Sequence, residues 1–415
     1  MQKTYDRTET RPRLAFMSIL LPFLKLGLTS FGGPIAHLGY FRTEFVSRRK
    51  WLDDSAYADL VALCQFLPGP ASSQVGFSIG LMRGGLLGGL AAWLGFTLPS
   101  ALVLMLFAYG LAGFDTPLAQ GALHGLKVVA VAVIAQAIWG MARQLSPDRP
   151  RIAIAVTGVV AVVFLGGVGG QLTAIAIGAF AGLWFCQDLM PAGDGTPHAP
   201  FASPIPRIAA LVVLLLAVAL LFLLPAISAA GFGGHGLALF DAFYRAGALV
   251  FGGGHVVLPL LQVSVVQPGW ISGDDFLAGY GAAQAVPGPL FTFAAYLGAA
   301  NGIAPNGWLG AAIALVGIFL PGLLLILGTL PFWERLRRHA MARAILSGVN
   351  AAVVGLLAAA LYDPVWVSAI TGPRDFALAL ICFMLLAAWK MQPWVVVLLS
   401  ACGGMLLAIP GLAAG

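Results

Sequence analysis

The chain has 415 residues, of which 60% are hydrophobic and only 9% carry a charge. Soluble domains carry roughly a quarter charged residues, so this composition excludes a soluble protein and indicates an all-α polytopic membrane protein. The formal net charge of +6 does not indicate a nucleic-acid partner, because the basic residues lie in short loops where they act as topology signals.

Apolar segments follow one another along the whole chain, as expected for repeated membrane crossings. They cover residues 14–40, 55–82, 85–112, 118–141, 152–168, 170–188, 208–229, 237–263, 275–300, 306–330, 341–362, 375–389 and 392–411. A polar stretch with five prolines, from Gln187 to Arg207, interrupts them. We therefore expect a first transporter repeat (1–190), a proline-rich linker (191–207), an inverting transmembrane helix (208–236) and a second transporter repeat (237–415).

The first apolar segment contains the motif FGGP at Phe31 to Pro34. Adjacent glycines and a proline interrupt a helix, so we expect a hairpin or a strongly broken helix here. Lys25 precedes the motif and His37 follows it, and ionisable residues in apolar segments are functional candidates. The alternatives are that Lys25 extends to the membrane surface and that His37 is a structural histidine.

The second apolar segment contains QFLPGP at Gln65 to Pro70, followed by Ser72, Ser73 and Gln74. Pro-Gly-Pro ends one half-helix and allows another to begin, which frees backbone polar groups inside the membrane. The N-terminus of the second half-helix suits an anion, and the glutamine and serine side chains add neutral donors. The alternative is that these side chains only bond to neighbouring helices.

The second half of the chain repeats these motifs. FGGG at Phe251 to Gly254 corresponds to FGGP, and QAVPGP at Gln284 to Pro289 corresponds to QFLPGP. The interval between Trp51 and Gln65 equals that between Trp270 and Gln284. Paired broken helices at corresponding positions of two repeats indicate the substrate site of a transporter.

Basic residues are distributed in opposite ways in the corresponding loops of the two halves. The first half has a basic run of Arg42, Arg48, Arg49 and Lys50, and the corresponding loop of the second half has no basic residue. The second half has a basic run of Arg335, Arg337, Arg338 and Arg343, and the corresponding loop of the first half, around Asp115, has no basic residue. Basic loops favour the cytoplasm, so the sequence predicts two inverted-topology repeats with a cytoplasmic N-terminus and an external C-terminus. Segment 55–82 then enters and leaves the membrane by the same face, so we expect broken or re-entrant helices at the FGG and PGP motifs.

The predicted substrate site consists of backbone groups and neutral donors at the four motifs. Its residues are Gly32, Gly33, Gln65, Pro68, Gly69, Pro70, Ser72, Ser73, Gln74, Gly252, Gly253, Gln284, Pro287, Gly288, Pro289 and Thr292. The candidates for attracting an anion or carrying protons are Lys25, His37, Glu44, Arg83, Arg245 and His255. Asp53, Asp54 and Asp59 are further carboxylates, and helix capping is the simpler role for the first two. No Walker, HExxH or nucleophile-base pattern occurs, so we expect no enzyme, no cofactor and no metal site.

These motifs resemble those of the chromate ion transporter family. The matching stretches are FGGPIAHLGYFRTEFVSRRKWLDD, QFLPGPASSQVGFSIG and GFTLPS in the first half, and FGGGHVVLPLL and QAVPGP in the second. The resemblance covers nearly the whole chain and implies the long, two-domain bacterial form. Such a protein lies in the inner membrane and exports chromate using the proton-motive force, so the implied partners are a chromate or sulfate-like oxyanion, protons and membrane lipid. A homodimer is left open.

Two other functions remain as alternatives. A carrier of sulfate or another anion, or an anion channel, would use the same broken helices, and chromate and sulfate differ little in size and charge. A membrane-embedded enzyme or scaffold is disfavoured by the missing catalytic pattern. The second half also departs from the first, because FGGG replaces FGGP and LFTF replaces ASSQ. Whether the halves contribute equally to binding is therefore open.

Overall fold

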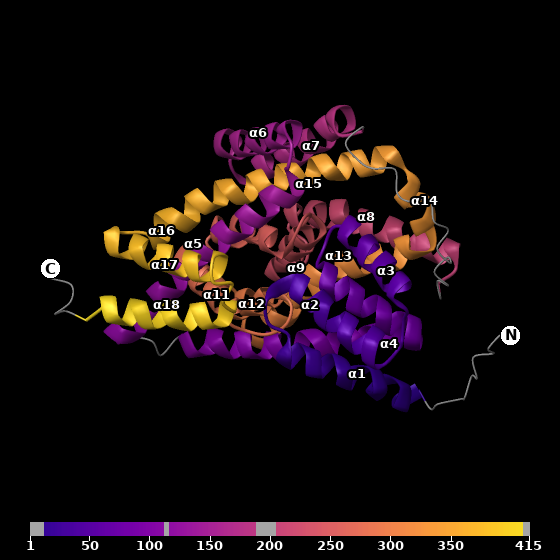
Figure 1. The fold of residues 1–415 in the computed structure, drawn as a ribbon, viewed down its shortest axis with the longest axis horizontal. Helices are drawn as coiled ribbons and strands as arrows, with labels where there is room; N and C mark the ends of the chain where they lie inside the picture. Colours follow the sequence, from indigo (N-terminus) through magenta and orange to yellow (C-terminus); the bar gives the residue numbers. More distant parts are fainter. Residues whose placement is uncertain (1–11, 112–115, 188–204, 410–415) are drawn as a thin grey trace.

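The computed structural model describes residues 12–111, 116–187 and 205–409, and every regular element in these ranges is a helix (Figure 1). Asp115 and most of the expected linker lie outside the described residues. Among the described helices, six are long and apolar enough to cross a membrane, and shorter apolar helices accompany them. The all-α polytopic membrane fold predicted from the composition is confirmed.

The helices follow the order of the predicted apolar segments. The first half contains α1 (Pro12–Thr29), α2 (Gly33–Phe41), the π-helix η1 (Arg42–Arg48), α3 (Asp54–Phe66), α4 (Ala71–Leu111), α5 (Pro117–Leu145), α6 (Arg149–Leu165) and α7 (Gly167–Phe185). Helix α8 (Arg207–Ala229) leads to the second half. This half contains α9 (Gly234–Ala248), η2 (Gly254–Val256), α10 (Val257–Leu261), the π-helix η3 (Gln262–Val266), α11 (Gly273–Ala283), η4 (Leu290–Thr292), α12 (Phe293–Ala300), α13 (Gly307–Thr329), η5 (Leu330–Phe332), α14 (Trp333–Arg338), α15 (Ala340–Ala360), η6 (Leu361–Trp366), α16 (Val367–Ala369), α17 (Pro373–Ala387) and α18 (Pro393–Leu407).

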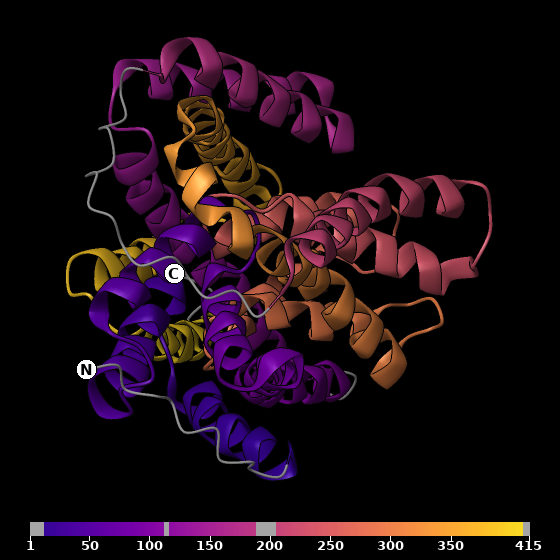
Figure 2. The same cartoon turned by 90° about the vertical axis from the view of Figure 1, so that its right-hand side faces the viewer.

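Each half packs its last helix pair on a long helix of the other half. Helices α6 and α7 pack on α15, and α17 and α18 pack on α5. In Figure 2 the pair α6 and α7 lies above α15 at one edge of the molecule. Small residues allow these approaches, as is usual between membrane helices. The Ser400 hydroxyl donates a hydrogen bond to the carbonyl of Gly125 (2.8 Å), and Gly178 packs on the backbone of Gly348.

Helix α4 consists of two parts that run in opposite directions. Gly84 and Gly85 leave helical geometry (φ −141° and +61°), and a Cβ on Gly80 would collide with the carbonyl of Gly88. Residues eight apart in a straight helix lie about 12 Å apart, so this contact requires a reversal of the chain. The second part of α4 therefore runs back along the first part. The first part itself lies beside α3.

The two hairpins that contain the PGP motifs close on themselves in the same way. In the first, the guanidinium carbon of Arg83 lies 5.1 Å from the ring centroid of Trp51, next to the beginning of α3. In the second, the amide of Gly302 donates a hydrogen bond to the carbonyl of Trp270 (2.9 Å) before the beginning of α11. Both PGP motifs are thereby placed at the far ends of closed hairpins.

A buried carboxylate organises the connection before the first hairpin. Glu44 accepts hydrogen bonds from Arg48 (2.8 Å) and Arg49 (2.7 Å), and Arg49 also lies over the ring of Trp51. This group lies outside the membrane-spanning helices. Burial opposes ionisation, but the hydrogen bond from Arg49 and the charges of Arg48, Arg49 and Lys25 outweigh it and hold the pKa of Glu44 below its ordinary value of 4.5.

Replacing the small residue at the α5–α18 contact should destabilise the fold. A Cβ on Gly125 would lie 2.8 Å from the Cα of Ala401, so we expect Gly125→Leu to cost about 1–3 kcal/mol of stability. Gly140→Leu is the control in the same helix, because a Cβ there meets nothing within 4 Å. Thermal unfolding in detergent measures both, and equal melting temperatures for the two variants would contradict this packing.

Glu44→Gln should remove a pH-dependent part of the stability. The pKa is lower in the folded state, so the ionised carboxylate stabilises the protein above its unfolded pKa, and this contribution is lost as the pH falls through the folded value. We expect a loss of about 1–3 kcal/mol at pH 7 that shrinks below about pH 4. Asp54→Asn is the control, since its ion pair with Arg42 is exposed and such pairs contribute about 0–1 kcal/mol. A Glu44→Gln loss that stays constant between pH 7 and pH 3 would exclude the carboxylate charge as its cause.

Candidate functional site

Each PGP motif is hydrogen-bonded to the helix break of the opposite half. The amide of Gly69 donates to the carbonyl of Val250 (2.8 Å), immediately before FGGG. The amide of Gly288 donates to the carbonyl of Ser30 (2.9 Å), immediately before FGGP. The helices α1 and α9 end at these points, and the breaks predicted at the FGG motifs are present. All four motifs therefore meet in one central region.

Only glycine fits the middle of each PGP motif. Gly69 and Gly288 have φ angles of +116° and +102°, which side chains with a Cβ rarely adopt. A Cβ on Gly69 would lie 3.1 Å from the Cα of Gly322, and a Cβ on Gly288 would lie 2.8 Å from the Ser100 hydroxyl. Ser100 and Gly322 follow the prolines inside α4 and α13. The two halves thus contact each other reciprocally here as well.

A cavity of about 340 Å³ lies between the first FGG break and the second PGP motif. The predicted site residues that line it are Gly32, Gly33, His255, Gln284 and Gly288. The N-terminus of α2 faces it through Gly33 and Ala36, and the beginning of η4 faces it through Leu290. Two helix N-termini, backbone breaks and an amide side chain can together bind an anion.

Three polar residues of the cavity were not predicted from the sequence. They are Gln136 in α5, and Lys390 and Gln392 in the connection between α17 and α18. A polar side chain inside an apolar segment was the available signal for Gln136. The signal for Lys390 was a basic residue between two adjacent apolar segments, 375–389 and 392–411.

His255 and Gln284 have polar atoms close to the cavity. Nδ1 of His255 lies 2.7 Å from the hydroxyl of Tyr280. The side-chain nitrogen of Gln284 is buried near the Tyr280 side chain, and it makes no hydrogen bond within 3.5 Å to any described residue. An unpartnered buried donor costs free energy, so a ligand acceptor at this point would be favourable.

Three of the four donors that follow the PGP motifs make contacts within the protein. The side-chain nitrogen of Gln74 donates to the carbonyls of Pro68 (2.9 Å) and Gly322 (3.0 Å). The Thr292 hydroxyl donates to the carbonyl of Pro289 (2.7 Å). The hydroxyl of Ser72 lies 3.4 Å from Nδ1 of His37.

The other predicted site residues lie around the central region without lining the cavity. Ser73 is buried and its hydroxyl has no partner within the described residues, whereas Gln65 is exposed at the end of α3. Pro70 packs against Gly322, and a Cβ on Gly252 would meet the side chains of Leu145 and Asn350. Gly253, which follows Gly252, and Pro287, which precedes Gly288, are half-buried.

The charged candidates outside the cavity pair with other groups. Arg245 forms an ion pair with Asp241 (2.9 Å), Arg83 lies over Trp51, and Lys25 is exposed within range of the Glu44 charge. Asp53 caps α3 by accepting from the amide of Ala56 (2.7 Å), which confirms its expected role. Of the six charge and proton candidates, His255 alone lines the cavity.

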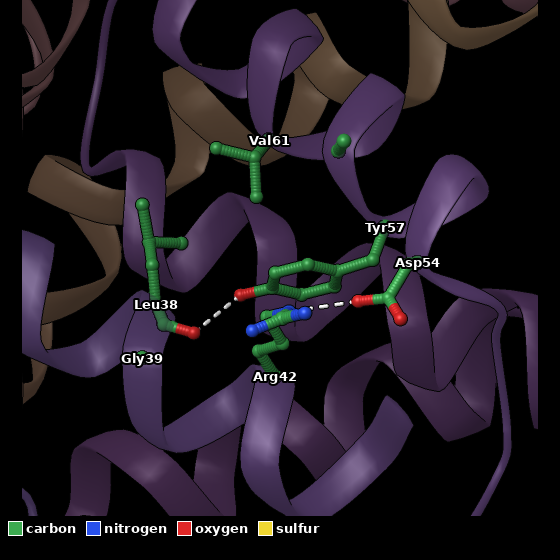
Figure 3. A pocket seen from close by; sticks show the side chains of 7 residues that line it. Leu38, Gly39, Arg42, Asp54, Tyr57 and Val61 are labelled. Atoms are coloured by element: carbon green, nitrogen blue, oxygen red, sulfur yellow. Dashed lines mark hydrogen bonds and ion pairs between the residues drawn. The ribbon is translucent and has the colours of Figure 1, made fainter. Parts of the chain in front are cut away.

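A second hollow, of about 480 Å³, lies between α2 and α3. Figure 3 shows Arg42 lying close to the ring of Tyr57, with its guanidinium directed at Asp54 (2.7 Å). The Tyr57 hydroxyl donates to the carbonyl of Leu38 (2.7 Å). The charges in this hollow neutralise each other, so it suits an anion less well than the central cavity.

Comparisons with known proteins match both halves of the chain to one family. The family model described as Chromate transporter matches residues 17–183 and again residues 237–405. The chain is 31% identical to the chromate transport protein of Pseudomonas aeruginosa, over 94% of this chain and 92% of that protein. It is 26% identical to a probable chromate transport protein of Synechococcus elongatus, over 87% of each chain.

A shorter relative matches one part of the chain. The uncharacterized transporter YwrA of Bacillus subtilis is 30% identical over 37% of this chain but 87% of its own length. No solved structure matches the chain. Members of the matched family are transporters, which removes the enzyme alternative. With family matches over both halves and a relative above 30% identity along nearly the whole length, the chain belongs to the chromate transporter family.

Proposed function

We propose that the protein is a secondary transporter that exports chromate from the cytoplasm across the bacterial inner membrane, driven by the proton-motive force. The observation that carries this proposal is the central cavity, which combines helix breaks of both halves with amide side chains. Chromate is a tetrahedral divalent oxyanion. Its oxygens can accept hydrogen bonds from backbone amides at helix N-termini and from the side-chain amides of Gln284 and Gln392. The side-chain nitrogen of Gln136 already donates to the carbonyl of Leu386 (3.3 Å) and has a second hydrogen to offer.

Two inverted repeats would place the cavity at their interface. The family model matches each half separately, which supports repeats at 1–190 and 237–415, joined by the linker 191–207 and the helix of 208–236. In Figure 1 helix α3, the first part of α4 and helix α14 lie toward the end where α1 begins, whereas α18 ends at the opposite end of the long axis. This arrangement supports a cytoplasmic N-terminus and an external C-terminus.

The depth of the cavity fits loading from the cytoplasm. Gln136 is five residues beyond Val131, the midpoint of α5, and therefore about 8 Å closer to the end of that helix. Arg143 lies near this end, and basic residues favour the cytoplasmic side. The imidazole of His255 is the titratable group best placed to exchange a proton as the substrate leaves.

Sulfate transport is the second candidate function, because the size of the cavity admits sulfate as well as chromate. A water molecule occupies about 30 Å³ in the liquid, so about 340 Å³ holds an oxyanion together with part of its hydration shell. A partly hydrated tetrahedral anion offers little basis for separating chromate from sulfate.

Uptake into everted membrane vesicles tests both candidates. Chromate accumulation that depends on an imposed pH gradient supports proton-coupled export. Accumulation of sulfate without chromate would assign the protein to the second candidate, and passive flux of both anions would indicate a channel. No flux of either anion would reject the proposed function.

Gly69→Ala and Gly288→Ala should each reduce chromate uptake by at least about tenfold at matched protein levels. The added methyl group would oppose the positive φ angle and collide with the opposite half. Gly231→Ala is the control, since Gly231 also has a positive φ of 80° but a Cβ there meets nothing within 4 Å. Uptake reduced equally in all three variants would mean that backbone strain alone, and not contact between the halves, explains the loss.

Accessibility of introduced cysteines should reveal the inverted topology. A membrane-impermeant thiol reagent applied to intact cells should label Pro268→Cys but not Lys50→Cys or Arg335→Cys. Everted vesicles should give the opposite pattern, which provides the control. Labelling of Lys50→Cys and Pro268→Cys from the same side would contradict inverted repeats.

A further inference from the structure

The connection between α17 and α18 brings one lysine into the central cavity. Among the residues that line the cavity, Lys390 is the only lysine or arginine. The uncharged side chains of Gln136 and Gln392 line the same cavity. We infer that Lys390 is the charged anchor of a divalent oxyanion in this cavity. This inference rests on the proposed function, because it names the counter-charge of the same site.

The lengths of the short helices support a position of Lys390, whose side chain is exposed in the structure, inside the apolar layer of the membrane. The last turn of α18 lies beside the beginning of α5, where a Cβ on Gly121 would meet Ala408. The 15 residues of α18 span roughly 22 Å, which is less than the apolar layer of about 30 Å. The connection before Pro393 therefore stops short of the opposite membrane surface.

Lys390 lacks an anionic partner in the part of the chain that the structure describes. The described ion pairs involve other basic residues, among them Arg245 with Asp241 and Lys127 with Asp274. A lysine within the membrane is costly unless it is paired or functional. A bound oxyanion would supply the missing negative charge.

The backbone at Lys390 is also unusual. Its φ angle is +52°, and Lys50 is the only other described non-glycine residue with a positive φ. Strain of this kind persists when the surroundings impose it, and it often marks ligand sites. The same connection reaches the first FGG break, where a Cβ on Gly32 would lie 3.9 Å from the side-chain oxygen of Gln392.

The first half has no counterpart of this lysine. Contacts of α7 and α18 align at a spacing of 222 residues, because Gly178 packs on α15 as Ser400 packs on α5. At the same spacing Lys390 corresponds to Val168, which is apolar. The charge is therefore supplied once, and the cavity can bind one anion asymmetrically although the motifs occur twice.

Chemical rescue of a cysteine variant separates charge from structure. Cys402 is exposed and the other three cysteines are buried, so Cys402→Ser provides the background for Lys390→Cys. We expect the apparent affinity for chromate in vesicles to fall by about tenfold or more. Modification with 2-aminoethyl methanethiosulfonate, which adds an ammonium group, should restore most of the affinity. The sulfonatoethyl and methyl reagents should not.

Lys390→Gly and Lys50→Cys are the matched variants. Glycine adopts the positive φ angle without strain, so Lys390→Gly should fold normally and still lose about tenfold in affinity. Lys50→Cys removes a lysine with the same backbone angle outside the cavity and should leave the affinity unchanged. Rescue of Lys390→Cys by the methyl reagent as well as by the ammonium reagent would show that bulk, and not charge, matters, and would overturn the inference.

Protection from labelling tests binding independently of transport. Chromate or sulfate should slow the reaction of the Lys390→Cys thiol in detergent-solubilised protein, but not that of Lys50→Cys. Protection in a protein that moves no anion would reject the proposed function while supporting the inference. Normal transport without protection and without a loss of affinity in Lys390→Gly would retain the proposed function and overturn the inference.

Discussion

Two crossed hydrogen bonds hold the centre of this protein together. The amide of Gly69 reaches the carbonyl of Val250, and the amide of Gly288 reaches the carbonyl of Ser30. Each bond satisfies backbone groups that a helix break would otherwise leave unpaired in an apolar region, where an unpaired group is expensive. Each half therefore supplies a hydrogen-bond partner for the backbone at the helix break of the other half. The central region is a joint product of both halves and not two sites side by side.

Corresponding contacts join the two halves, yet the halves are not equal at the cavity. The cavity lies beside the first FGG break, whereas the corresponding glycine of the second break, Gly252, faces Leu145 and Asn350. Gln74, which follows the first PGP motif, donates a hydrogen bond to the carbonyl of Gly322 in the opposite half. The residues of the second PGP hairpin and the second FGG break that line the cavity include Gln284 and His255. The first PGP motif thus serves mainly as a contact between the halves, whereas the second PGP motif lines the cavity.

Much of this could be predicted from the sequence, because helix breaks depend on local chemistry. Proline and glycine mark the breaks at FGG and PGP wherever they occur, and the apolar segments mark the helices. What the sequence could not reveal is which polar atoms remain free after packing. Ser72 and Gln284 look equally available in the printed chain, yet Ser72 is buried against His37 and Gln284 lines the cavity. Lys390 enters the site through a contact between segments more than 350 residues apart, and such contacts have no local signature.

The most direct test of a shared site is to measure how one ligand protects a cysteine from each half of the cavity lining against thiol labelling. Ala36 belongs to the first half and Val286 to the second, and both line the cavity. In the Cys402→Ser background, chromate should slow thiol labelling of Ala36→Cys and of Val286→Cys with the same half-maximal concentration. Protection of only one of the two, or protection at clearly different concentrations, would contradict a single oxyanion site built from both halves.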